Sequence, residues 1–451
     1  MKNAKTPELY RGMFLVVAAV LSATGVPYAV AEGQLTLPEA IRIVKLQSEE
    51  ALLLVEKENR LESQKRELYA GALPQINFYA NAGRGQSPFD PKAMGIDNAP
   101  IINKAMSRYA YGLEVTQPIY SFGRLGQAFD VAAKKIRSQN EANRRSRQQL
   151  ELQTLEAFYG VITANARLRV LEASIKRQRE TMGFLESNFK MGAGMRSTAL
   201  LATAAFKALE PERIRAERDA IAARMAFNRL LGRPIEGPLD LDTTVLSLTS
   251  FPLLDTSEAG MNAQLDKRPD LNSLHLQKET MQGYAKGYRM LYRPSLGFQG
   301  KLGVLAYDPG QLTHTSKNLE YQYGVGLQWP LFDGLSNSSK AKQFDSDVRT
   351  LDLTERQARA FSRIEMKSAL SEAQAADTAL VASEQAREAS AEALQLISDD
   401  FRSGKGHIFD LLGAEETLRN TEFGAMAART QKARSIAMLR LALGMNLLEE
   451  N

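Results

Sequence analysis

The chain repeats a set of motifs at a fixed offset, and this repeat restricts its possible folds more than any other feature. Tyr111-Gly112 recurs 212 positions later as Tyr323-Gly324. The other pairs at this offset are Gln117-Pro118-Ile119 with Trp329-Pro330-Leu331, Phe189-x-x-Gly192-x-Gly194 with Phe401-x-x-Gly404-x-Gly406, and Leu231-Gly232 with Leu443-Gly444. A unit of about 210 residues is too long for a solenoid repeat. We therefore expect two related halves of one architecture.

Each half contains two segments with the alternating pattern of strands. They are residues 72–84 and 108–120 in the first half, and residues 292–306 and 320–332 in the second. Tyrosines gather in or beside these segments, and the single tryptophan, Trp329, joins them. Aromatic residues at strand ends are typical of a membrane β-barrel. Tyrosine-rich hairpins of a soluble protein remain the alternative at this point.

Long helical stretches follow each strand pair. Residues 125–190 contain no proline, and about 60 helical residues would span about 90 Å. Apolar residues recur at spacings of three and four, as in a coiled coil. A second helix is expected at 198–231, with a kink at Pro211, and the second half repeats the pair at 336–401 and 408–443. Helices this long need partners along their length.

The N-terminus has the features of a signal peptide. Lys2, Lys5 and Arg11 precede the apolar run 12–26, and Ala29-Val30-Ala31 matches a small-x-small cleavage site. A run of 15 residues is short for a membrane helix, which needs about 20. We expect cleavage after Ala31 and export of the mature chain.

The composition argues against most enzyme chemistry. The chain has no cysteine and three histidines, which excludes disulfides and thiolate metal sites. It has no GxSxG or Walker A motif, so we expect no catalytic residues, no metal and no cofactor. The net charge of +5 is spread along helical segments beside acids, so we expect no nucleic-acid partner.

The ordered set of motifs resembles the TolC-like outer-membrane efflux protein family. The motifs of the first half are LTLPEAI (35–41), LPQI (73–76), TQPIYSFGR (116–124), FKMGAG (189–194) and LLG (230–232). Those of the second half are KRPDL (267–271), YRPSL (292–296), WPLFDG (329–334), FRSGKG (401–406) and ALG (442–444). The resemblance covers essentially the whole mature chain.

The resemblance implies a mixed α and β membrane protein that forms a homotrimer. Four strands per chain would give a 12-stranded outer-membrane β-barrel, continuous with a long periplasmic α-helical barrel. Physics agrees, because four strands cannot close alone and open sheet edges are not tolerated in lipid. The expected organisation is a signal peptide (1–31), an N-terminal helix (32–71), a first strand pair (72–120), a first helical hairpin (121–232), an equatorial segment with a connecting helix (233–291), a second strand pair (292–333), a second helical hairpin (334–444) and a short tail (445–451).

The resemblance also implies sites at the ends of the helices. Family channels close at the periplasmic tips of the hairpins, where acids ring the aperture. Asp410 matches the first of two such acidic positions, Gly413 occupies the second, and Thr198 is the counterpart of Asp410 in the first half. We hypothesise that three Asp410 carboxylates form a ring that attracts cations. The alternative is a solvated carboxylate stabilised by the helix dipole.

Other positions have roles implied by their place in the pattern. Three basic residues near the same turns hold the closed state by ion pairs or are ordinary surface residues: Arg196, Arg402 and Lys405. The tips are also where a periplasmic adaptor would dock, through Phe189, Gly192, Gly194, Phe401, Gly404 and Gly406. The expected strand-to-helix joints contain Pro118, Gly123, Pro330 and Gly334, which suit an abrupt change of backbone geometry.

The function that these observations favour is a passive outer-membrane conduit of a Gram-negative tripartite export system. Its partners would be a periplasmic adaptor, an inner-membrane ABC or proton-driven transporter, and outer-membrane lipid. Type I protein secretion and multidrug efflux fit equally well, with a slight preference for these over metal export. A periplasmic coiled-coil adaptor is the alternative, although it gives no reason for four tyrosine-rich strands.

Overall fold

The computed structural model describes residues 34–86, 105–242, 258–313 and 317–447. The expected signal peptide at 1–31, most of the loop at 85–107, part of the equatorial segment and the end of the tail lie outside these residues. The elements are α2 (Leu37–Gln47), α3 (Glu49–Ala70), β1 (Gln75–Gly85), β2 (Met106–Tyr120), α4 (Arg124–Lys190), α5 (Arg196–Leu230), α6 (Glu258–Leu265), α7 (Pro269–Met290), β3 (Ser295–Ala306), a 3-10 turn (Pro309–Thr313), β4 (Leu319–Gln328), α8 (Ser336–Arg402) and α9 (Ile408–Ala442).

The repeat in the sequence is a repeat of elements with matched lengths. Helices α4 and α8 have 67 residues each, and α5 and α9 have 35 each. Helices α3 and α7, which precede the strands, have 22 residues each. The chain is therefore internally duplicated, as expected, and each half has the order helix, two strands, long helical hairpin.

The four strands form one antiparallel sheet in the order β1-β2-β3-β4, so β2 and β3 join the two halves. The register separates the side chains cleanly, because directly paired residues lie on the same face. One face has rows such as Phe78, Leu113, Leu302 and Tyr321, all of them exposed in the single chain. The opposite face has the row Asn77, Glu114, Lys301 and Gln322. An exposed apolar face opposite a polar face is the pattern of a lipid-facing strand layer.

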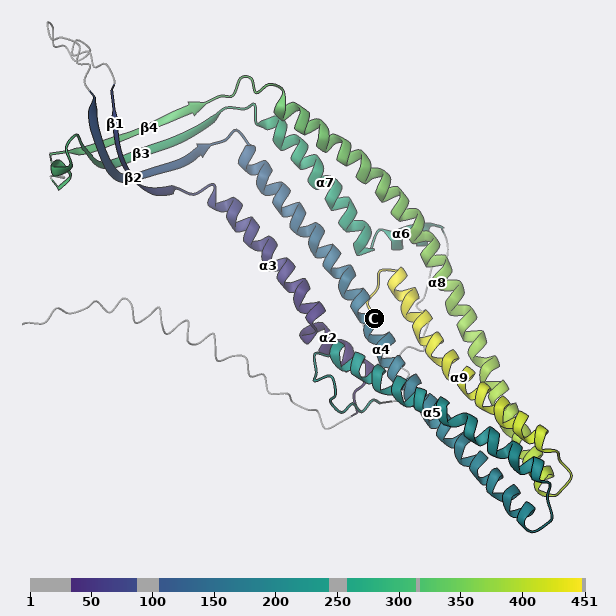
Figure 1. Cartoon of the computed structure of the whole chain (residues 1–451). Coiled ribbons are helices and arrows are strands. Elements are labelled where there is room, and N and C mark those ends of the chain that lie inside the picture. The colour runs from purple at the N-terminus through teal and green to yellow at the C-terminus, as the bar shows by residue number, and fades with distance from the viewer. Residues whose placement is uncertain (1–33, 87–104, 243–257, 314–316, 448–451) are drawn as a thin grey trace, which may run out of the picture.

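The helices extend from one end of the sheet to a pair of tips (Figure 1). Helix α4 packs against α3, α5, α7 and α9, and α8 packs against α7 and α9. The two hairpins α4/α5 and α8/α9 end together at the lower right of Figure 1. No helix in the described part of the chain combines the length and the apolarity of a membrane span.

Several boundaries differ from the sequence-based expectation by a few residues, and two of the differences have a clear physical cause. The N-terminal helix, expected within residues 32–71, divides into α2 and α3 at Ser48, whose backbone is extended. The Ser48 hydroxyl accepts a hydrogen bond from the Ala51 amide at 3.1 Å and so caps α3. Strand β4 ends at Gln328 and not at Phe332, because Pro330 has no N–H to donate to a ladder.

Candidate functional site at the helical tips

The turns at the two tips have the same backbone geometry, which explains the repeated glycines. In the first turn Gly192 has φ +75°, its amide donates to the Phe189 carbonyl, and the Ala193 amide donates to the Asn188 carbonyl. This pair of bonds is a Schellman motif, whose left-handed position favours glycine. The second turn repeats it with Gly404 at φ +81°.

The second glycine of each tip allows the chain to pass close to the helix it has just left. A Cβ atom on Gly406 would lie 2.9 Å from the Phe401 amide nitrogen, and one on Gly194 would lie 3.3 Å from the Asn188 Cβ. Phe401 is half-buried and meets Phe184 edge to face at 6.5 Å between ring centres. Phe189 remains exposed. Both tips are thus rigid turns with an aromatic residue beside them.

Asp410 and Thr198 occupy equivalent places, the third residue of α9 and of α5. The Asp410 side chain is exposed, whereas Thr198 is half-buried and donates to the Met195 carbonyl at 2.6 Å. The helix dipole favours a carboxylate in the first helical turn, whether Asp410 forms a ring in the trimer or is simply solvated. The three basic residues of the tips (Arg196, Arg402 and Lys405) are also exposed.

An ion pair with a buried carboxylate joins the two hairpins, about two turns of α9 away from the tip. The Arg177 Nε of α4 donates to both carboxylate oxygens of Glu415 of α9, at 3.2 and 3.0 Å. Glu415 is 4% exposed, while the side chain of Arg177 is 31% exposed. Both residues line a cavity of about 580 Å³ whose other walls come from α4, α8 and α9. The hairpins thus leave space here, and a charged contact joins them beside it.

Burial dominates the ionisation of Glu415. Loss of hydration raises the pKa of this carboxyl above its usual range, although the hydrogen bonds and charge of Arg177 and the charge of Arg419 act in the opposite direction. The contact between the hairpins thus contains a carboxylate whose charged form is disfavoured by burial.

On both sides of this pair, an apolar cluster packs the hairpins against each other. Its members come from α4, α5, α8 and α9: Leu185, Ala199, Ala202, Leu394, Ile408, Leu411 and Leu418. The two hairpins therefore share one core at the tip.

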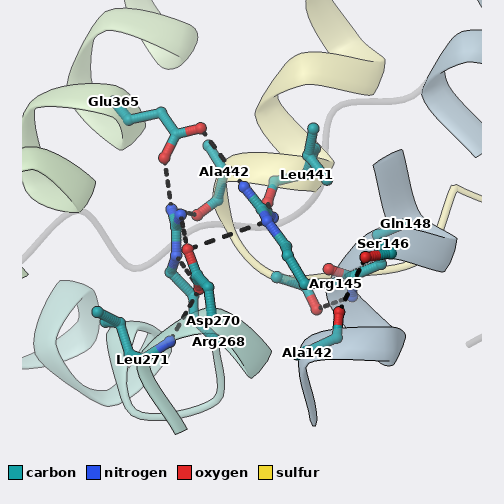
Figure 2. Close-up of polar contacts among 11 residues, drawn as sticks. Ala142, Arg145, Ser146, Gln148, Arg268, Asp270, Leu271, Glu365, Leu441 and Ala442 are labelled. Atoms are coloured by element: carbon teal, nitrogen blue, oxygen red, sulfur yellow. Dashed lines mark hydrogen bonds and ion pairs between the residues drawn. The ribbon is translucent and has the colours of Figure 1, made fainter. Parts of the chain in front are cut away.

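The opposite end of α9 is held by two arginines, of which Arg268 is buried and Arg145 is partly buried (Figure 2). Arg145 of α4 donates to the Leu441 carbonyl and Arg268, the residue before α7, donates to the Ala442 carbonyl, both at 2.6 Å. Farther along α4, the Gln148 amide donates to the Gly444 carbonyl at 2.7 Å. Cations at a helix C-terminus donate hydrogen bonds to its free carbonyl groups and interact favourably with the helix dipole.

Acidic partners compensate these arginines. Arg268, which is 2% exposed, pairs with Asp270 and with Glu365 of α8, each at 2.8 Å. Burial opposes ionisation of Asp270, but the hydrogen bonds and charge of Arg268 and the charge of Arg145 outweigh it and hold its pKa below the usual range. The network connects α4, α7, α8 and α9 and fixes the end of the second hairpin that lies away from the tip.

The strand-to-helix joints share one unusual backbone feature. Each has two consecutive residues in the left-handed region: Phe122 (φ +48°) with Gly123 (φ +87°), and Gly334 with Leu335 (both φ +67°). At the offset of 212 these positions coincide, but the glycine is second in one joint and first in the other. Pro118 lies beside a register shift near the end of β2, and Pro330 follows β4.

Sequence reasoning missed both charged contacts. Arg268 and Asp270 belong to the KRPDL motif, where an arginine before a Pro-Asp helix start was the available signal. Arg177 and Glu415 lie 238 residues apart and have no such signal. Within the described residues no group of three or more acids or histidines is placed to hold a metal ion.

Comparisons with known proteins agree with this architecture. The model of the family described as outer membrane efflux protein matches residues 57–233 and 261–445. The alkaline protease secretion protein AprF of Pseudomonas aeruginosa is 24% identical over 275 residues, which cover 61% of this chain and 56% of that protein. The outer membrane protein TolC of Vibrio cholerae is 25% identical over 383 residues, 82% of each chain.

The fold is also that of a solved outer-membrane channel. The Campylobacter jejuni CmeC channel superposes with a TM-score of 0.76 at 14% identity, over 92% of this chain and 87% of that one. The mixed α and β fold expected from the sequence is confirmed, and the adaptor alternative is not favoured. A family model that matches both halves decides the identity: the chain belongs to the outer membrane efflux protein family.

Proposed function

We propose that three copies of this chain form an export channel across the outer membrane. The observation that carries the proposal is the sheet, which has two open edges, β1 and β4, and one exposed apolar face. Lipid does not tolerate unpaired edges, so β4 of one copy would pair with β1 of the next until twelve strands close. The helical layers would continue this barrel as a periplasmic tunnel.

The test of the assembly is electrophoretic. The purified chain should give a detergent-resistant trimer that converts to a band near 50 kDa on boiling, in line with a chain mass of 49.9 kDa. A monomeric species that remains soluble without detergent would refute the proposal.

The channel would be a passive conduit that opens when the hairpins separate at their tips. The cavity between the hairpins and the pairing of Arg177 with the buried carboxylate of Glu415 beside it support this location. The tip residues carry the docking surface for a periplasmic adaptor, and energy comes from an inner-membrane transporter. Because the chain has no cysteine, single cysteines introduced beside Gly192 or Gly404 would give unambiguous cross-links to an adaptor.

Three Asp410 carboxylates would face the closed aperture and favour cations. Planar-bilayer recordings of Asp410→Asn should therefore show reduced cation selectivity and weaker block by divalent cations. The matched control is Asp399→Asn, an exposed acid at the end of α8. Unchanged selectivity in the Asp410 variant, or an equal loss in both variants, would exclude the ring.

Type I protein secretion is the substrate class that we favour over multidrug efflux. One relative is named for the secretion of an alkaline protease, which supports a protein substrate. A strain lacking the gene should lose one or more proteins from its culture medium while its drug sensitivity stays the same. The reverse result would assign the channel to drug efflux.

A further inference from the structure

A second cavity lies between α3, α4 and α7, near the sheet and far from the tips. It has a volume of about 290 Å³ and an apolar wall that includes Leu61 and Leu68 of α3, Val131 and Ala132 of α4, and Leu291, the residue after α7. Cavities that bind small molecules have volumes from about 300 Å³ upward and mostly apolar walls. The size therefore suits a small ligand or a short chain.

The charged residues around this cavity are all cations. Lys65, Arg124 and Lys135 line it, and no acid does. Lys65 pairs with Glu62 at 3.8 Å, while the Lys135 ammonium donates to the neutral Gln64 amide oxygen, at 3.3 Å, and forms no ion pair within the described residues. The acids of this region are engaged elsewhere, since Asp130 and Glu279 both pair with Lys134, at 3.2 and 3.6 Å. An apolar cavity with such a rim is complementary to an amphipathic anion.

Two glycines of α7 shape the cavity in different ways. A Cβ on Gly283 would lie 2.4 Å from the Val131 side chain, so this glycine allows α7 to pack against α4. A Cβ on Gly287 would meet only the Gln127 side chain, at 3.8 Å. The wall at Gly287 is therefore open, and a larger side chain can be added there without a backbone clash.

We infer that this cavity binds a small amphipathic anion, with an apolar body about the size of one medium-length acyl chain and a carboxylate or sulfonate head. The apolar body lies against Val131, Ala132 and Leu291, and the head lies beside Arg124 or Lys135. The site is separate from the tips and does not depend on how the channel opens.

The test is equilibrium dialysis of radiolabelled decanoate against the full-length protein in lipid nanodiscs, with empty nanodiscs as the partition blank. One saturable site per chain is expected. Decanol, which has the same chain length and no charge, should bind about tenfold more weakly, because a charge-assisted hydrogen bond is lost. Absence of saturable binding would show that the cavity is filled within the assembly, and equal binding of decanol would show a merely apolar groove; either result overturns the proposal.

Two variants locate the site. Gly287→Leu should abolish saturable binding, whereas Gly126→Leu should retain it, because Gly126 is an exposed glycine of α4 outside the cavity with no atom within 4 Å of a new Cβ. The double variant Arg124→Gln with Lys135→Gln should weaken decanoate about tenfold and leave decanol unchanged. The change in the ratio of decanoate affinity to decanol affinity tests the site even if Gly287→Leu does not assemble. Decanoate binding that survives Gly287→Leu, or that is unaffected by the loss of both Arg124 and Lys135, would refute the site.

Discussion

Replacing Arg177 by glutamine removes the cation that faces a buried carboxylate between the two hairpins. Glu415 is 4% exposed and accepts both hydrogen bonds from the Arg177 Nε, at 3.2 and 3.0 Å. Loss of one partner of a buried pair costs about 3–5 kcal/mol, since the other charge stays buried without compensation. Because Arg177 is 31% exposed, the lower end of this range applies.

If the channel opens by separation of the hairpins at the Arg177–Glu415 contact, the loss of Arg177 changes the balance between closed and open channels. The carboxylate is hydrated in the open channel, so the cost falls on the closed state. A loss of about 3 kcal/mol lowers the ratio of closed to open channels roughly 150-fold. Single-channel recordings of the full chain in planar bilayers at neutral pH measure this ratio directly.

The control is a second ion pair between the same two helices. Arg434 of α9 meets Glu156 of α4 at 2.7 Å, but the side chains are 51% and 38% exposed. Exposed pairs contribute about 0–1 kcal/mol, so Arg434→Gln should change the ratio about fivefold at most. Arg177→Gln with Glu415→Gln removes both charges and should restore closure. If Arg177→Gln gates like the wild type or like Arg434→Gln, the ion pair does not hold the channel closed.

Three further outcomes follow from the same contacts. Because burial raises the pKa of Glu415, the protonated form of Glu415 favours the closed state. Closure is therefore strongest below the usual carboxyl range and weakens as the pH rises through the raised pKa. Acidification should lower the open probability of the channel, and an increase in open probability would contradict this. Arg268→Gln should destabilise the protein by about 3–5 kcal/mol and Glu365→Gln, whose side chain is 39% exposed, by about 1 kcal/mol or less; equal shifts of the urea midpoint in detergent would count against the buried network. Gly334→Ala should cost about 1–2 kcal/mol by the same assay, although no atom lies within 4 Å of the new Cβ, whereas Gly324→Ala in β4 should cost little; a silent Gly334 variant would mean that the left-handed backbone is not needed.

The parts of the fold that the sequence predicts are those with local causes. Gly192 and Gly404 end helices because a left-handed residue is needed at one position of a Schellman motif, and such a need is visible in the sequence. The alternation in the strands reflects two faces with different surroundings, so it too can be read from neighbouring residues. The roles of Asp410 and of the docking residues at the tips stay predictions.

The contacts that could not be predicted join distant segments. Many arginines and glutamates of the long helices have i,i+3 or i,i+4 partners on their own surface, such as Arg213 with Glu210 and Glu217. Nothing in the sequence distinguishes Arg177 from these, because its partner lies on another helix. The break at Ser48 could have been predicted from the sequence, since a serine followed by two glutamates is a common helix start. The helical spacing of apolar residues on both sides of Ser48 instead favours one continuous helix.

The equal lengths of α4 and α8 restrict how such a chain can change over time. One residue inserted into a helix advances everything beyond it by 1.5 Å and rotates it by about 100°. An insertion in α4 alone would therefore lower one tip relative to the other and turn its packing face away from its neighbour. Lengthening the tunnel by seven residues would require the same addition in α4, α5, α8 and α9, so the length of the tunnel can change only when both duplicated halves change together.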